Sequence, residues 1–230
     1  MKAKSDALRG SKRAAAAEKE RGGTPSRMPH AERRAQILAT ASEFFADYGL
    51  TAQTRRLAEE CGISQRLLYR FFPTKEDLLA EVYREEILGA FKGVWFAELG
   101  DRSRSVEERL TVFYTDYLRN TLSRKWLRLF MYASLSESAM APDYISSIIT
   151  QLLELIMSEA AHERGVILPD DKPALHEMGW TLHGAISHYA IRRHLYRASH
   201  TLPEERVVEM HVRMFLAGFD AMLAPYIAAD

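Results

Sequence analysis

The stretch CGISQRLLYRFFPTKEDLL, residues 61–79, decides how this chain folds. It follows a short helix predicted over residues 53–60, and Gly62 lies where a residue with positive φ would end that helix. Ser64 is a good N-cap for a second short helix, which extends to Phe71. Two short helices joined by a tight glycine turn are typical of the helix-turn-helix motif.

The second short helix divides its side chains between two sides. At the helical spacing, Leu68 and Phe72 lie toward one side, together with Ser64 and Phe71. Arg66 and Arg70 are a like-charge pair at i and i+4, and no acid in this helix offsets them, so an external anion would. Arginine and glutamine suit base edges in the major groove, and tyrosine suits phosphate oxygens. The side facing away from Leu68 therefore has the chemistry of a DNA-reading surface and carries Gln65, Arg66, Tyr69 and Arg70.

Another helix begins immediately after Pro73. Thr74 is its predicted N-cap, and Asp77 completes the spacing of a capping box. Lys75 lies in the first turn, where unpaired backbone N–H groups also attract phosphate. The start of this helix is thus a second candidate contact with a nucleic-acid backbone.

The rest of the chain shows helical periodicity and no strand signals. Met1 to Met28 is polar, basic and without aromatic residues, which predicts a disordered tail. We therefore expect an all-α fold with about nine helices, over residues 29–48, 53–60, 64–71, 74–95, 106–122, 124–137, 142–164, 174–198 and 203–226.

Charge is unevenly distributed along a chain whose net charge is zero. Residues 1–75 hold 15 Lys/Arg against 8 Asp/Glu, a net of +7, and residues 76–230 hold 16 against 23, a net of −7. A basic amino-terminal third on an acidic body indicates a partner that is a polyanion. A sequence-independent DNA-architectural protein, which would use the basic tail and head, stays open as an alternative.

Other function classes find no support in the motifs. The chain lacks a Gly-rich phosphate loop, a GxSxG elbow and metal-spaced His/Cys motifs, so neither an enzyme nor a cofactor is expected. Cys61 is the single cysteine, which fits a reducing compartment. The sequence shows no signal peptide and no membrane-length apolar run, so we expect a cytoplasmic protein, associated with the bacterial nucleoid when bound to DNA.

Residues 33–82 resemble the DNA-binding domain of TetR/AcrR-family transcriptional regulators. The resemblance lies in LAEECGIS, in LYRFFPTKEDLL, and in the IL-x-x-A and F-x-x-x-G patterns of the first helix, formed by Ile37, Leu38, Ala41, Phe45 and Gly49. It implies a helix-turn-helix DNA-binding domain over residues 29–75, a linking helix over 74–95, and an effector-binding and dimerisation domain over 76–230. The body follows only the family's general helical plan.

The resemblance also implies where DNA would be contacted. Gln53 opens the second helix, where a phosphate contact is usual. Bases would be met at the start of the recognition helix, by Gln65, Arg66 and Leu67 after the Ser64 cap. Phosphates would be gripped by Tyr69, Arg70 and Lys75.

Three positions depart from the family pattern, and they leave the operator sequence unpredicted. Arg66 and Leu67 replace a small residue and a Thr-like polar residue, and Arg56 replaces a commonly acidic one. Leu67 cannot hydrogen-bond. It would either touch a thymine methyl group or pack against the core.

For the body, the resemblance implies a homodimer formed through the last two helices and bound to a pseudo-palindromic operator. The helix over 203–226 is apolar on more than one stripe, which is compatible with such pairing. A small hydrophobic or aromatic effector would release this repressor from DNA. The pocket candidates, each of which would serve equally well as ordinary core, are Phe113, Tyr117, Trp126, Phe130, Tyr144, Met178, Trp180 and His183.

The histidines near the end of the chain do not have metal-site spacing. His176, His183 and His194 share a helical face, but their separations of 7 and 11 residues place them about 10 and 16 Å apart. One metal ion requires ligands about 2 Å from it. No metal site is therefore expected.

Overall fold

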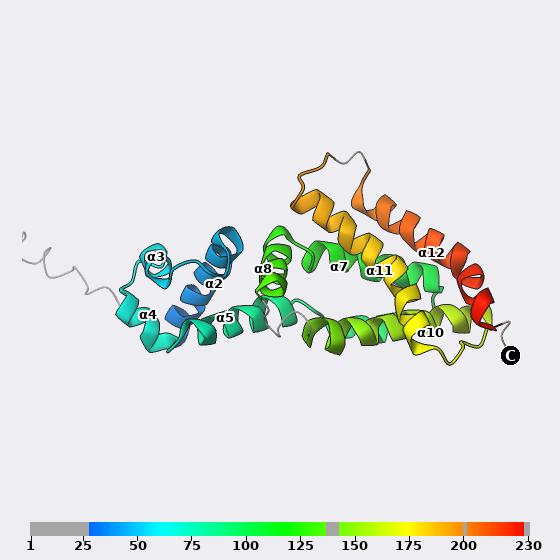
Figure 1. The fold of residues 1–230 in the computed structure, drawn as a ribbon, viewed down its shortest axis with the longest axis horizontal. Helices are drawn as coiled ribbons and strands as arrows, with labels where there is room; N and C mark the ends of the chain where they lie inside the picture. Colours follow the sequence, from blue (N-terminus) through cyan, green and yellow to red (C-terminus); the bar gives the residue numbers. More distant parts are fainter. Residues whose placement is uncertain (1–27, 137–142, 200–201, 228–230) are drawn as a thin grey trace, which may run out of the picture. The chain divides into compact units, whose positions relative to one another are not determined.

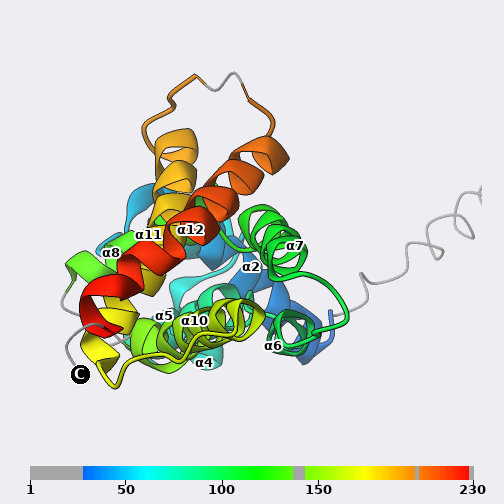
Figure 2. The ribbon, with the colours of Figure 1, turned by 90° about the vertical axis from the view of Figure 1, so that its right-hand side faces the viewer.

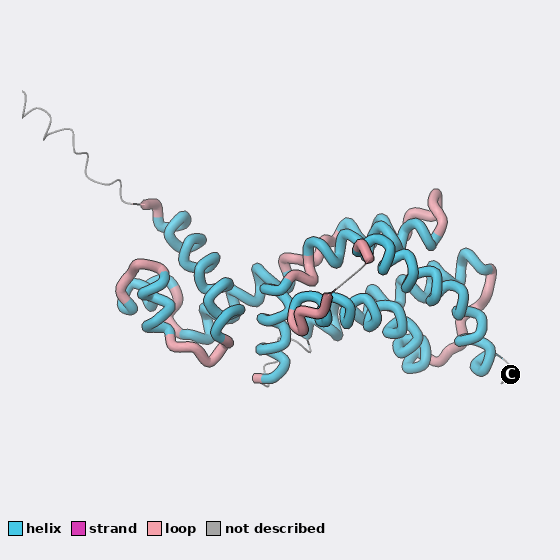
Figure 3. The backbone as a smooth tube through the Cα atoms, turned by 90° about the horizontal axis from the view of Figure 1, so that it is seen from above, coloured by secondary structure: helices cyan, strands magenta, loops and turns pink. Residues whose placement is uncertain are grey.

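A computed structural model describes residues 28–136, 143–199 and 202–227 of the chain (Figure 1). In these ranges the regular structure consists of α-helices with two π-helical segments, and no strand occurs (Figure 3). The all-α prediction is confirmed. The predicted tail, apart from Met28, lies outside the described residues.

The chain divides into two units, Met1–Gln36 and Ile37–Asp230, with the boundary inside the first described helix. That helix, α2 (His30–Tyr48), ends where Gly49 adopts a φ of +84°. The first unit contributes only the beginning of α2 to the described residues. The features below belong to the second unit.

Two short helices, α3 (Thr54–Glu60) and α4 (Gln65–Phe71), pack against each other and precede α5 (Lys75–Tyr83). They form because each contributes apolar side chains to one core, and α4 is also capped by a side chain at its start. Leu57 and Ala58 are buried, as their spacing predicts. The order of helix, short helix, glycine turn and short helix is therefore present.

The prediction of one continuous linking helix over residues 74–95 is wrong. After α5 the helix widens into the π-helical segment η1 (Arg84–Leu88) and ends, and α6 (Val94–Leu99) starts afresh. A Cβ on Gly89 would lie 2.5 Å from the Glu85 carbonyl oxygen, so only glycine fits where the wide turn closes. This break accounts for one helix more than the sequence predicts in this region.

The body consists of longer helices that pack side by side. They are α7 (Val106–Asn120), α8 (Arg124–Leu135), η2 (Ile145–Ile149) running into α10 (Thr150–Arg164), α11 (Lys172–His194) and α12 (Glu204–Ile227). α7 packs on α12 and α6, and α10 packs on α11 and α6. α11 and α12 lie alongside each other (Figure 2). Within the described ranges no helix combines the length and the apolarity needed to span a bilayer.

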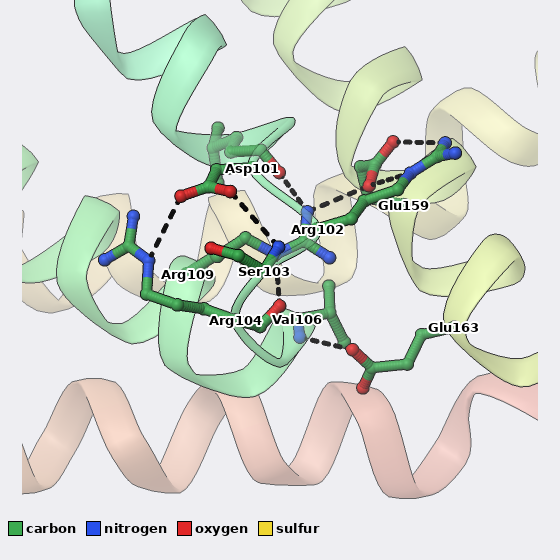
Figure 4. Close-up of polar contacts among 9 residues, drawn as sticks. Asp101, Arg102, Ser103, Arg104, Val106, Arg109, Glu159 and Glu163 are labelled. Carbon is green, nitrogen blue, oxygen red and sulfur yellow. Dashed lines mark hydrogen bonds and ion pairs between the residues drawn. The ribbon is translucent and has the colours of Figure 1, made fainter.

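An ionic cluster centred on the buried residues Arg109 and Glu159 fixes the loop between α6 and α7 (Figure 4). Arg109 is buried and donates to two carbonyls of the loop region and, at 2.8 Å, to the Glu159 carboxylate of α10. Glu159 also accepts from Arg102 at 3.1 and 2.9 Å. The neighbouring Glu163 accepts from the backbone N–H of Val106 at 2.5 Å. The cluster therefore holds α7, α10 and the loop together.

Candidate nucleic-acid interface and ligand cavity

The turn between α3 and α4 has the geometry that its sequence predicts. Gly62 adopts a φ of +64°, and a Cβ placed on it would meet nothing within 4 Å. Glycine is needed there for its backbone conformation, since space is available. The Ser64 hydroxyl caps α4 by accepting from the Leu67 N–H at 3.2 Å.

Two apolar side chains anchor α4 in the core. Leu68 is 1 % exposed and Phe72 is 2 % exposed, as predicted for the inner side of this helix. Burying two such side chains contributes about 3–6 kcal/mol before the cost of ordering the chain. The orientation of α4, and with it the direction of its outer face, is therefore fixed by packing.

The outer face presents two exposed arginines. Arg66 and Arg70 are both exposed, and within the described part of the chain neither makes an ion pair or a hydrogen bond. With no acid in α4, their positive charge is uncompensated locally. Two guanidinium groups one helical turn apart suit an anionic surface.

Gln65 and Tyr69 are already tied to a neighbouring helix. Thr54, the first residue of α3, is buried, and its hydroxyl accepts from Gln65 Nε2 at 3.2 Å. The same hydroxyl lies 2.9 Å from the Tyr69 hydroxyl. This three-residue network holds both exposed side chains in place beside Arg66 and Arg70.

Lys75 is also engaged within the chain. Its ammonium donates to the Ala52 carbonyl at 2.8 Å and lies 5.9 Å from the centre of the Phe45 ring. Burial lowers the pKa of Lys75 below that of a free lysine. The capping box before it is complete, because Thr74 and Asp77 bond each other's backbone N–H groups at 3.1 and 3.0 Å.

The remaining predicted DNA contacts differ in their surroundings. Gln53 is the exposed N-cap residue of α3, and its side chain makes no cap hydrogen bond. Leu67 is half-buried and is not among the side chains that pack on the hydrophobic core of the described residues. Arg56, which departs from the family pattern but is not a predicted contact, stacks over the Tyr48 ring, 3.8 Å from its centre. Of the two alternatives for Leu67, core packing therefore finds no support in the structure.

A cavity of about 100 Å³ lies within the body. Six predicted pocket residues line it, namely Tyr117, Trp126, Phe130, Tyr144, Trp180 and His183. The other two, Phe113 and Met178, are buried but do not line it. Phe113 instead stacks on Tyr117 with ring centres 5.6 Å apart. Several aliphatic residues of the cavity wall were not predicted, because nothing in their spacing distinguishes a cavity residue from a core residue. They are Leu122, Leu127, Ile145, Ile149 and Ile191.

The polar groups of the cavity are neutral. The Tyr117 and Tyr144 hydroxyls are 3.3 Å apart, and His183 Nδ1 lies 3.4 Å from the Tyr114 hydroxyl. Burial lowers the pKa of His183 to about 4, so its ring is uncharged at neutral pH. Trp126 is 5 % exposed, and its Nε1–H is buried without a hydrogen-bond acceptor in the described structure.

A second, larger depression of about 720 Å³ lies along α10 and the beginning of α11. Its lining differs from that of the cavity, because it includes the exposed side chains of Glu154, Lys172 and Glu177. None of the predicted pocket residues lines it.

α8 connects the cavity wall with the end of α2. Trp126 and Phe130 of α8 line the cavity, with their rings stacked at 4.9 Å. From the same helix, Arg128 donates to the Ala46 carbonyl and, at 3.1 Å, to the Asp47 carbonyl. These carbonyls belong to the last turn of α2, where helical partners are lacking. One helix thus serves both as cavity wall and as C-terminal cap of α2.

The histidines of the described residues do not form a cluster with metal-site geometry. No group of three His, Cys, Asp or Glu side chains within the described ranges could hold a metal ion. His176 instead accepts a hydrogen bond from Trp180 Nε1 at 2.9 Å.

Comparison with known proteins places the amino-terminal region in one family. The model of the family described as bacterial regulatory proteins, tetR family, matches residues 37–82. The HTH-type transcriptional activator FasR of Mycolicibacterium smegmatis is 37% identical over 70 residues, 30% of this chain and 32% of FasR. The HTH-type transcriptional repressor KstR2 of the same organism is 37% identical over 89 residues, 38% of this chain and 42% of KstR2. The matched region therefore spans less than half the length of these curated relatives.

Solved structures share the fold over most of the chain. A TetR-like transcriptional regulator from Rhodococcus sp. RHA1 has a TM-score of 0.63 at 21% identity, covering 85% of this chain and 99% of that one. The fatty acid degradation regulator FadR from Bacillus halodurans has a TM-score of 0.60 at 16% identity, covering 80% and 94%. At these identities the likeness is one of fold alone.

Proposed function

Because the chain belongs to the TetR family of bacterial regulatory proteins, we propose that it is a transcriptional regulator whose helix α4 enters the major groove of an operator. The exposed pair Arg66 and Arg70 carries this proposal. The pair sits on a capped helix that Leu68 and Phe72 anchor, and no acid neutralises it within α4. A polyanion is the partner that this arrangement suits.

The proposed contacts divide between bases and phosphates. Arg66, with Gln65 and Leu67, would meet base edges, and Arg70 would bind phosphate. Tyr69 and Lys75 would reach phosphate while keeping their bonds to Thr54 and the Ala52 carbonyl. Such internal bonds hold these side chains in one position before DNA arrives, which lowers the entropy lost on binding. Ser64 and Gln53 would complete the contact at the two helix starts.

The test begins by selecting a binding site from random DNA. We expect Arg66→Ala to weaken binding about five- to 150-fold and to relax the preference at one base position. Arg70→Ala should weaken selected and random DNA alike and lower the salt slope by about 0.9, the value for one phosphate contact. Arg84→Ala, which removes an exposed arginine paired with Glu81, is the matched control and should bind normally.

Equal affinity for selected and random DNA at fixed salt would instead identify a sequence-independent DNA-architectural protein. Unchanged affinity in both α4 variants would contradict the proposed interface.

We further propose that two copies pair through α11 and α12. On α12, Met210 and Met214 are 44% and 64% exposed, although the chain's own core already buries Val212 and Phe215 on the opposite side. The exposed stripe continues through Ala217, Gly218 and Ala221, whose small side chains allow close helix approach. An apolar stripe of this length on a helix that is already packed on one side supports pairing with a second copy.

Met214→Glu places a charge at the centre of the stripe and should convert the dimer to a monomer in light-scattering measurements. Val94→Glu is the control, since Val94 is similarly exposed at 54% but belongs to α6. A dimer that survives Met214→Glu would place the interface elsewhere.

The cavity is the proposed effector site, and α8 is the element that would connect it with α2 of the predicted DNA-binding domain. Occupation by a small hydrophobic or aromatic molecule would shift the population toward states in which α8 and α2 no longer hold the DNA-bound arrangement. We propose repression as the mode of action, because occupying an operator is sufficient to block transcription. A reporter gene behind the selected operator should become active when the regulator is deleted. Loss of expression on deletion would indicate an activator.

A further inference from the structure

The cavity differs from ordinary core in having hydrogen-bond donors left over. Trp126 Nε1–H is buried and has no acceptor within the described ranges. Leaving a buried donor unsatisfied is costly, and most buried polar groups in proteins have a partner. The residue lines a cavity, so an acceptor placed in that cavity is a natural partner.

The tyrosine pair supplies a second donor. Tyr117 and Tyr144 have one hydroxyl hydrogen each, and the bond between their oxygens uses only one of the two. One O–H is therefore left to point elsewhere. Trp126 and Tyr144 are neighbours, with ring centres 5.5 Å apart, and both residues line the cavity.

The cavity wall carries no charge that would fix an ion. None of the residues lining it is Asp, Glu, Lys or Arg. Burial keeps the His183 ring neutral, and burial also raises the pKa of Tyr144 to about 12, so its phenol stays protonated. A charged ligand would lose its hydration without gaining a counter-charge.

The volume sets the scale of the ligand. A cavity of about 100 Å³ is somewhat smaller than the roughly 150 Å³ apolar cavity that accepts benzene in a well-studied example. Met131 is part of the wall, and its unbranched side chain can move to make room. A single ring is therefore the upper limit of size, and a small substituent on it requires Met131 to move.

We infer that the cavity binds an uncharged, single-ring molecule bearing a carbonyl-type oxygen, which accepts hydrogen bonds from Trp126 Nε1–H and from the Tyr117–Tyr144 pair. A carbonyl oxygen has two lone pairs and can accept from both donors at once. The inference rests on the proposed function in placing the effector in this cavity. It goes further by stating the chemical class of the ligand.

The test uses three probes of similar size and the protein without DNA. Acetophenone has the ring and the carbonyl, ethylbenzene has the ring alone, and benzoate has the ring and a charge. Calorimetry should show acetophenone binding about five- to 30-fold tighter than ethylbenzene, the range expected for one to two net hydrogen bonds, and benzoate should bind weakest. In ¹⁵N-labelled protein, one indole N–H signal should shift with acetophenone and much less with ethylbenzene.

Trp126→Phe identifies that signal and should reduce the preference for acetophenone to the part that the Tyr117–Tyr144 donor contributes, while leaving ethylbenzene binding. Because this variant removes a buried ring, its helical content is checked by circular dichroism, and the indole shift in the unmodified protein gives an independent readout. Equal binding of acetophenone and ethylbenzene, tightest binding of benzoate, or no binding of any probe would overturn the inference. Acetophenone that binds through Trp126 but leaves operator affinity unchanged would support the ligand class and contradict the proposed ligand response.

Discussion

Gly62→Ala should destabilise the helix-turn-helix, and the structure allows its cost to be isolated. Gly62 has a φ of +64°, and an added Cβ would meet no atom within 4 Å. Packing therefore adds no penalty. An L-residue with a side chain costs about 1–2 kcal/mol in this left-handed conformation relative to glycine.

A matched substitution removes the effect of the unfolded chain. Gly93 has helical angles, φ −57° and ψ −26°, and its Cβ position is also empty within 4 Å. Gly93→Ala should stabilise the protein by about 0.4–1 kcal/mol, because alanine restricts the unfolded state without strain in the folded one. The same gain applies at Gly62, so the difference between the two variants should equal the conformational cost alone, about 1–2 kcal/mol.

Stability is measured by urea denaturation, followed by circular dichroism. Hydrogen exchange of the α3 and α4 amides reports separately on the local stability of the helix-turn-helix. Gly62→Ala should accelerate exchange in those two helices, and Gly93→Ala should not. Gly62→Ala should also weaken operator binding, because the turn at Gly62 sets the direction of α4. The reasoning is refuted if the two alanine variants have the same stability, since the left-handed conformation would then carry no cost.

Two further substitutions test the polar contacts of the fold. Glu159→Gln should lower the free energy of unfolding by about 3–5 kcal/mol at neutral pH, because it leaves buried Arg109 without a counter-charge, whereas Glu163→Gln should have little effect. Hydrogen bonds from Arg102, and then from Arg109, lower the pKa of Glu159. Its stabilisation should therefore be full above the unfolded pKa of about 4.3 and decline as the pH falls below it, and a difference that persists unchanged in acid would contradict this account. Thr74→Ala should cost about 1 kcal/mol by removing the capping box, while Thr74→Ser should retain it, and equal stability of the two in thermal denaturation would show that the cap contributes nothing.

The head was predictable from sequence because its determinants are local. The glycine turn, the Ser64 and Thr74 caps and the inward leucine and phenylalanine each depend on residues within about one helical turn of one another. The break after η1 was missed because apolar residues keep their helical spacing through Ile87 toward Trp95. Gly89 and Gly93, four residues apart, were the available signal.

The hydrogen bonds and the burial of the site residues depend on contacts that sequence spacing does not reveal. Thr54 lies in α3, and nothing in its sequence position shows that its hydroxyl would hold both Gln65 and Tyr69. Lys75 donates to a carbonyl 23 residues earlier in the chain. Likewise, the spacing of the aromatic residues indicated six of the cavity residues, but it could not distinguish them from Phe113, which is buried and does not line the cavity.

The position of α8 has a consequence for how such a regulator would respond to dose. Arg128 caps α2 from the same helix that places Trp126 and Phe130 in the cavity wall. Coupling between two binding events is reciprocal, so if the ligand weakens operator binding through α8, the operator must weaken ligand binding by the same factor. Protein bound to its operator would then need a higher ligand concentration to respond than protein free in solution. A cell that makes more regulator than it has operators would saturate the unbound copies first, and the switch would acquire a threshold.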